Sequence, residues 1–101
     1  MVRTNKNGIK IYGEEDFAGM RKAGQVAAQC LDYIADYVKV GVSTGELDDL
    51  CNEFMKSKGA VSACIGYHGY PKATCISINQ VICHGIPDYE RKLADGDILN
   101  I

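Results

Sequence analysis

Apolar residues recur at spacings of three and four along residues 14–39, and this period predicts a long amphipathic helix. Three acidic residues at positions 14–16 suit its first turn, where free backbone N–H groups and the helix dipole favour negative charge. Gly41 is expected to follow the end of the helix. The predicted apolar face consists of Phe17, Met20, Gly24, Ala27, Leu31, Ile34 and Val38.

A second helix is predicted to begin after Ser43. Ser43 and Glu46 match the S-x-x-E capping box, in which the serine hydroxyl accepts from a free N–H and the carboxylate bonds back. Gly59 is expected to end this helix. Asp48 and Asp49 are interpreted as members of its solvated face. Its apolar face consists of Leu47, Leu50, Cys51, Phe54 and Met55.

Beyond Gly59 the pattern becomes typical of short strands and turns. Residues 61–65 are expected to form a short strand, and β-formers alternate with period two within residues 73–83. A last strand is predicted over residues 97–101. Residues 1–13 are expected to be an extended lead-in. The pattern therefore predicts a mixed α/β chain.

Composition and charge are those of a folded soluble protein, with 47% hydrophobic residues, 24% charged residues and a net charge of −2. Basic residues form no run longer than a pair, so nucleic acid is not an expected partner. The first residues lack the apolar region of a signal peptide, and no apolar run is long enough to span a bilayer. The five cysteines form no CxxC pair, so we expect reduced thiols and a cytoplasmic location.

Residues 64–71 are the first candidate for chemistry. Tyr67, His68 and Tyr70 lie there between two glycines and a proline, which restrict the backbone. Aromatic faces, with sulfur from Cys64 or Cys75, can hold an apolar side chain in a small pocket. The alternative is a surface turn with packed tyrosines.

His84 is the second candidate, because it directly follows an apolar segment that is predicted to be a strand. A histidine there can donate to or accept from a substrate near neutral pH, but it can also have a purely structural role. A Cys83–His84 nucleophilic pair is disfavoured, because adjacent strand residues point to opposite faces. A zinc site among the cysteines, His68 and His84 stays open, although the paired short spacings of structural zinc sites are absent.

Taken together, these segments resemble the N-terminal part of type I methionine aminopeptidases of the bacterial kind, over residues 14–101. The YHGYP string at residues 67–71 and the CHGIP string at residues 83–87 carry most of the resemblance. The sequence matches the family pattern at residues 20–24, 41–48, 62–71, 75–79, 83–87 and 95–101. The resemblance implies the α/β (α+β) pita-bread fold, with residues 14–101 as the N-terminal half of the catalytic domain, built of two helices and antiparallel-type strands. It also implies metal-dependent removal of the initiator methionine from nascent proteins.

The resemblance also implies roles for individual residues. His84 matches a catalytic histidine that contacts the substrate near the scissile peptide. The backbone carbonyls of Asn79 and Val81 match positions that hold a monovalent cation in some members. Two divalent metal ions (Co, Mn, Fe, Zn or Ni) are implied, with two Asp, one His and two Glu as ligands, all expected beyond Ile101. The substrate-binding positions are His84, Cys64, Tyr67, His68, Tyr70 and Cys75.

Three functional hypotheses follow. The first is a methionyl aminopeptidase that acts on nascent polypeptide N-termini, with the ribosome as one place of encounter, and that is a monomer when complete. We expect the 101-residue chain by itself to release no methionine, because the implied ligands lie outside it. The second is a metal-free pita-bread module that binds peptides or proteins, and the third is a small thiol or zinc protein.

Overall fold

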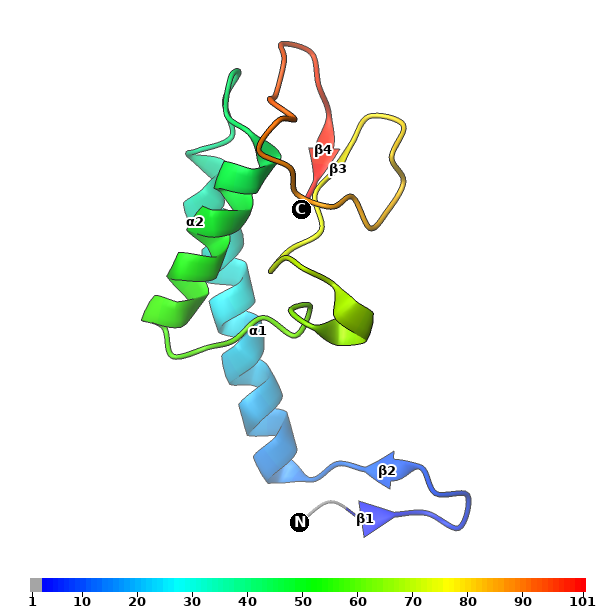
Figure 1. Cartoon of the computed structure of the whole chain (residues 1–101). Helices are drawn as coiled ribbons and strands as arrows, with labels where there is room; N and C mark the ends of the chain where they lie inside the picture. Colours follow the sequence, from blue (N-terminus) through cyan, green and yellow to red (C-terminus); the bar gives the residue numbers. More distant parts are fainter. Residues whose placement is uncertain (1–2) are drawn as a thin grey trace.

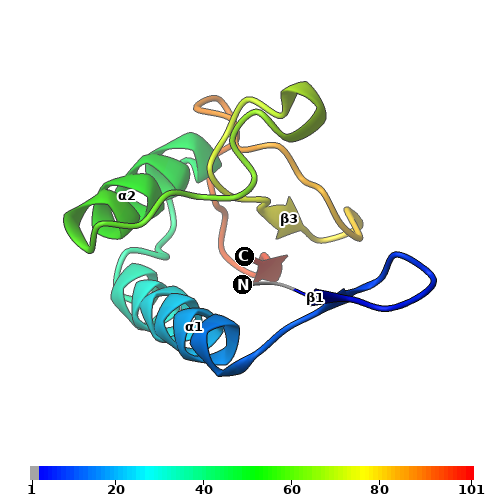
Figure 2. The same ribbon diagram turned by 90° about the horizontal axis from the view of Figure 1, so that it is seen from below.

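A computed structural model describes residues 3–101. Helices α1 and α2 run antiparallel and side by side, and the β3–β4 pair lies beside them (Figure 1). Figure 2 shows both helices on one side and the irregular segments around β3 on the other. The elements are β1 (Arg3–Thr4), β2 (Lys10–Ile11), α1 (Glu14–Ala35), α2 (Thr44–Ser57), the 3₁₀ turn η1 (Tyr67–Gly69), β3 (Ser77–Ile78) and β4 (Leu99–Asn100).

Helix α1 begins where the acidic residues predicted it, and the Asp16 carboxylate accepts from the Gly13 N–H at 2.9 Å. It ends at Ala35, four residues before the predicted end. Its 22 residues exceed the 14 of α2, so α2 covers only the later turns (Figure 1). No helix within residues 3–101 has the length and apolarity needed to cross a membrane.

The predicted apolar face of α1 is therefore only partly a core face. Ile34 is 2% exposed, whereas Met20 is 74% exposed. Phe17 and Leu31 are also exposed, and Cys30, outside the predicted face, is buried. Periodicity identifies which side of a helix is apolar, but the length of the neighbouring helix decides how much of that side is covered.

Helix α2 begins and ends where the sequence predicts, but only half of the predicted capping box forms. The Ser43 hydroxyl accepts from the Glu46 N–H at 3.0 Å, whereas the Glu46 carboxylate does not bond back to Ser43. At its end, the Gly59 and Ala60 N–H groups bond to the carbonyls of Lys56 and Met55, at 3.0 and 2.9 Å. Gly59 has a φ of +72°, the left-handed conformation that this C-terminal motif requires.

The strands are shorter than predicted. β3 pairs antiparallel with β4 through Ser77↔Asn100 and Ile78↔Leu99 only. The prediction of a strand over residues 61–65 is wrong, since these residues form no strand. The Ser62 hydroxyl instead accepts from the Cys64 N–H at 3.1 Å and donates to the Ala73 carbonyl. These side-chain bonds make a turn in place of a sheet ladder.

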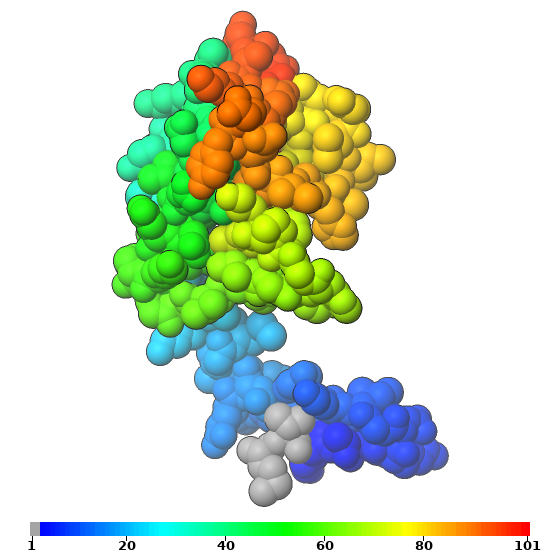
Figure 3. Space-filling view, viewed as in Figure 1, coloured from blue at the N-terminus to red at the C-terminus, as the bar shows by residue number. Residues whose placement is uncertain are grey.

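The lead-in forms a hairpin, with β1 antiparallel to β2 in the register Thr4↔Lys10. At its tip, the Asn5 carboxamide oxygen accepts from the N–H groups of Asn7 and Ile9, at 2.9 and 3.0 Å. The hairpin and the first turns of α1 stand apart from the rest of the molecule (Figure 3). The molecule is therefore elongated, with principal extents of 52 × 27 × 22 Å.

The core lies between the last turns of α1, helix α2 and the β3 segment. Leu47 is fully buried, and Phe54 stacks on Tyr33 across the helix pair with ring centroids 4.9 Å apart. Burial, together with the neighbouring Cys30, raises the pKa of the Cys51 thiol to about 12, so it stays neutral. The core consists of Cys30, Ile34, Leu47, Cys51, Ile76, Ile78 and Leu93.

We predict that Leu47→Ala lowers the free energy of unfolding by about 3 kcal/mol, because it leaves a cavity at the centre of this core. Leu31→Ala is the matched control: Leu31 is 51% exposed, so the loss should be below about 1 kcal/mol. Urea unfolding followed by circular dichroism measures both. Equal losses in the two variants would contradict the placement of the core.

Candidate functional site

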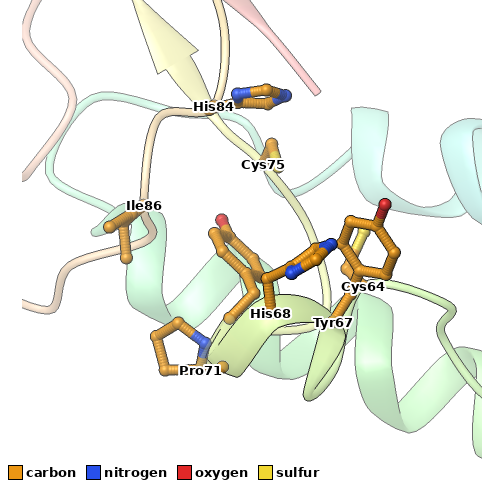
Figure 4. A pocket seen from close by; sticks show the side chains of 9 residues that line it. Cys64, Tyr67, His68, Pro71, Cys75, His84 and Ile86 are labelled. Carbon is orange, nitrogen blue, oxygen red and sulfur yellow. The ribbon is translucent and has the colours of Figure 1, made fainter.

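One pocket of about 500 Å³ brings together all six residues that the sequence analysis placed at a substrate site. They come from three segments: the loop around η1, the residues before β3, and the loop after it. In Figure 4, His84 and Cys75 lie on one side of the pocket, opposite Tyr67, His68 and Cys64. The lining residues are Cys64, Tyr67, His68, Gly69, Tyr70, Pro71, Cys75, His84 and Ile86.

The η1 loop owes its shape to left-handed backbone at three positions, Gly66 (φ +78°), His68 (φ +48°) and Gly69 (φ +80°). The Gly66 N–H bonds to the Tyr70 carbonyl at 2.8 Å and closes the loop. The rings of Tyr67 and His68 meet edge to face, with centroids 4.4 Å apart. A tight backbone thus presents two aromatic rings side by side at the pocket, both on exposed residues.

Tyr70 ties this loop to the segment before β3. Its hydroxyl donates to the Thr74 carbonyl at 2.7 Å. Burial first, and then the neighbouring Cys75 thiol, raise the pKa of Tyr70 well above its usual value of 10.0. The phenol is therefore a neutral donor that braces the pocket wall. Cys64 and Cys75, both half-buried, add thiol sulfur to the lining.

His84 lies in the left-handed region with φ +57° and is exposed. The predicted strand before it is absent, since β3 ends at Ile78. The strand-alternation argument against a Cys83–His84 pair therefore does not apply, and Cys83 is an exposed thiol outside the pocket lining. The hydrogen bonds of Gly85 fix the backbone beside His84.

Gly85 packs directly against the segment that leads into β3. Its carbonyl accepts from the Ile76 N–H at 2.8 Å, and its N–H donates to the Ser77 hydroxyl at 3.1 Å. A Cβ at position 85 would lie 2.7 Å from the Ile76 carbonyl carbon and 2.9 Å from the Ser77 Cα. Only glycine permits this close approach of the two backbones.

Asn79 and Val81 lie in the turn after β3, outside the pocket lining. Asn79 has a φ of +53°, and its side chain donates to the Asp97 carboxylate at 2.9 Å and accepts from the Ile98 N–H. The pKa of Asp97 is lowered, chiefly by the Ala94 N–H and then by Asn79. This network explains the shape of the turn, while a cation at the two backbone carbonyls stays a prediction.

The described residues do not fit the two divalent ions that the resemblance implies. Within residues 3–101, no three His, Cys, Asp or Glu side chains converge in a way that could hold a metal ion. Cysteines and histidines share the pocket, yet they do not form such a group. The hypothesis of a small zinc protein therefore has no support in this part of the chain.

Asp48 is a buried residue that the sequence pattern did not reveal, and the prediction that it lies on a solvated helix face is wrong. Asp48 is 4% exposed, and one carboxylate oxygen accepts from both the N–H and the hydroxyl of Thr74, each at 2.7 Å. A signal was present in the sequence. Asp48 directly follows Leu47 and precedes Cys51 by three, and both of these lie on the predicted apolar face.

We predict that Gly85→Ala destabilises the protein by about 2 kcal/mol or more, because the added methyl group overlaps backbone atoms that cannot move aside cheaply. Gly24→Ala is the control, since a Cβ there meets no atom within 4 Å and alanine favours a helix interior. Thermal unfolding should shift down for the first variant and not for the second. A Gly85→Ala protein as stable as the wild type would refute the close approach.

A model of metallopeptidase family M24 matches residues 18–101. The methionine aminopeptidase of Escherichia coli K12 is 60% identical over 94 residues, which cover 92% of this chain and 36% of that relative. The methionine aminopeptidase of Rickettsia prowazekii is 52% identical over 93 residues, with the same coverage. The chain thus spans a little over a third of the length of these relatives.

Two solved structures are similar to the whole described chain. The crystal structure of methionine aminopeptidase from Rickettsia prowazekii has a TM-score of 0.84 at 45% identity, and that from Thermotoga maritima has 0.85 at 30%. Each match covers 98% of this chain and 37% of the solved one. The predicted resemblance and the pita-bread fold class are confirmed. The chain belongs to metallopeptidase family M24.

Proposed function

We propose that this chain supplies the methionine-binding part of an aminopeptidase that removes the initiator methionine from nascent proteins. The observation that carries the proposal is the single pocket that gathers Cys64, Tyr67, His68, Tyr70, Cys75 and His84. The likeness to methionine aminopeptidases supports it as well, because it extends over nearly the whole chain. Residues 14–101 would form the N-terminal half of the catalytic domain.

The lining suits a methionyl side chain in its chemistry. Methionine is unbranched, and its polarizable sulfur makes favourable contacts with the edges of aromatic rings. Tyr67 and His68 offer such rings, while Cys64 and Cys75 offer soft thiol sulfur. Tyr70 keeps its polar hydroxyl occupied by the Thr74 carbonyl, so its ring faces the ligand without an unpaired donor.

His84 is the group that we assign to the peptide end of the ligand. It lies across the pocket from Pro71 and Tyr67 (Figure 4), and an imidazole can donate a hydrogen bond to a carbonyl or amide near neutral pH. If the methionyl side chain of a substrate lies against the η1 loop, the peptide group of that methionine lies toward His84. His84 thus binds and orients the substrate, and we assign no further catalytic step to the described residues.

The proposal also covers the enzyme's location, oligomeric state and bound ions. We place the enzyme in the cytoplasm, acting as a monomer on nascent polypeptide N-termini, with the ribosome as one place of encounter. Two divalent ions would be held by residues outside the described set, and a monovalent cation by the carbonyls of Asn79 and Val81.

A chimera tests the function most directly. The chain replaces the matched 94-residue segment of the Escherichia coli enzyme, and release of methionine from a Met-Ala-Ser peptide is measured. We expect the chimera to be active and His84→Ala to lower kcat about 100-fold, because an oriented hydrogen bond at the reacting group is lost. Metal content, measured by atomic emission, should not change.

Cys83→Ser is the matched control for this histidine, since Cys83 is its exposed neighbour outside the pocket. That variant should retain the kcat and KM of the chimera. Loss of bound metal in the His84→Ala chimera would mean that the assigned role is wrong. An inactive wild-type chimera with its full metal content would count against the proposed function itself.

We predict that the 101-residue chain alone releases no methionine with any of Co, Mn, Fe, Zn or Ni added. The reason is that residues 3–101 bring together no three side chains that could hold a metal ion. The assay uses the same peptide and detects free methionine by mass spectrometry. Measured turnover would overturn the prediction. Peptide binding without turnover, by a complete protein that retains no divalent metal, would favour the metal-free binding module.

A further inference from the structure

Asp48 is a buried carboxylate that the proposed function does not use. It lies on α2 and is 4% exposed, yet the one salt bridge within residues 3–101 joins other residues, Arg91 and Asp97. Burying a carboxylate is costly unless hydrogen bonds compensate for the lost water. Here the compensation comes from Thr74 and, at 3.4 Å, from the Ala73 N–H.

These hydrogen bonds hold the middle of a segment that lies outside any helix or strand. The Ser62 hydroxyl also bonds to its Ala73 carbonyl, and its Ile76 N–H bonds to the Gly85 carbonyl. Residues 71–76 belong to no helix or strand, so the N–H groups of Ala73 and Thr74 have no sheet or helix partner. Asp48 accepts from both of them and from the Thr74 hydroxyl. Hydrogen bonds to a charged acceptor are short and strong, and they are directional enough to fix a backbone.

The held segment is also a wall of the pocket. The Thr74 carbonyl accepts the hydroxyl of Tyr70 at 2.7 Å, and the next residue, Cys75, lines the pocket. Asp48 itself is not among the lining residues. A chain of contacts therefore runs from α2 through Thr74 to two residues that face the ligand.

We propose that Asp48 is a positioning residue for the methionine pocket: by fixing Thr74, it sets the place of the Tyr70 ring and of Cys75. The nature of the ligand rests on the proposed function, whereas the positioning of Tyr70 does not. Loss of the carboxylate loosens the pocket wall and weakens substrate binding, while His84 remains in place.

The first test uses the 101-residue chain with ¹³C-labelled tyrosine and follows each ring by NMR. Asp48→Asn keeps the side-chain shape but removes the charge, and it places an amide donor near the Ala73 N–H donor. We expect the Tyr70 signal to move or broaden. Asp49→Asn is the matched control, because Asp49 is exposed and accepts from the Tyr89 hydroxyl at 2.9 and 2.8 Å. That variant should move the Tyr89 signal and leave Tyr70 unchanged.

The second test uses the chimera and separates binding from turnover. Asp48→Asn should raise KM for Met-Ala-Ser roughly tenfold, the loss expected for a charge-assisted hydrogen bond, with kcat within about twofold. Asp49→Asn should leave both unchanged. A merely structural weakening would instead lower the amount of active enzyme, and hence the apparent kcat, without raising KM.

Thr74→Val keeps the test decisive if Asp48→Asn fails to fold. It retains Asp48 and the backbone hydrogen bond but removes the Thr74 hydroxyl donor, so it should move the Tyr70 signal in the same direction by less. An unchanged Tyr70 signal in a folded Asp48→Asn or Thr74→Val chain would overturn the positioning role. If Tyr70 responded while the wild-type chimera released no methionine, the proposed function would fail and the positioning role would stand.

Discussion

The buried carboxylate of Asp48 is the contact on which the arrangement of the pocket depends. The two helices form one packed unit through Leu47, Ile34 and their neighbours. The segment after η1 has no ladder or helix of its own and is attached to that unit by hydrogen bonds to Asp48. A charged acceptor in a low-dielectric setting binds its donors strongly, so an irregular segment can be as well placed as a strand.

A second constraint acts on the other side of the pocket. Gly85 lies so close to the backbone of Ile76 and Ser77 that no side chain fits, and this contact determines where His84 can lie. In the η1 loop, the left-handed backbone at Gly66 and Gly69 determines where Tyr67 and His68 can lie. The side chains of Tyr67, His68 and His84 are thus placed by backbone contacts more than by packing, which explains why they can remain exposed and still line one pocket.

Much of this could be predicted from the sequence where local rules decide the outcome. The cap at Ser43, the Gly59 terminus and the acidic start of α1 depend on neighbouring residues alone, and all three are found. The six pocket residues were identified by family resemblance and converge in the structure. Features that depend on contacts between distant parts of the chain could not be predicted from local sequence rules. The burial of Asp48 depends on Thr74, 26 positions later, and the exposure of Met20 depends on the short length of α2.

The central claim is that the pocket of the η1 loop and His84 receives a methionyl side chain. Titration of the chain with L-methionine, followed by NMR of its tyrosine and histidine rings, tests it most directly, with L-alanine as the control ligand. We expect saturable shifts at Tyr67, Tyr70, His68 and His84 with methionine only, and none at Tyr12 or Tyr33. Shifts that were absent, equal for the two amino acids, or largest at Tyr12 and Tyr33 would contradict it.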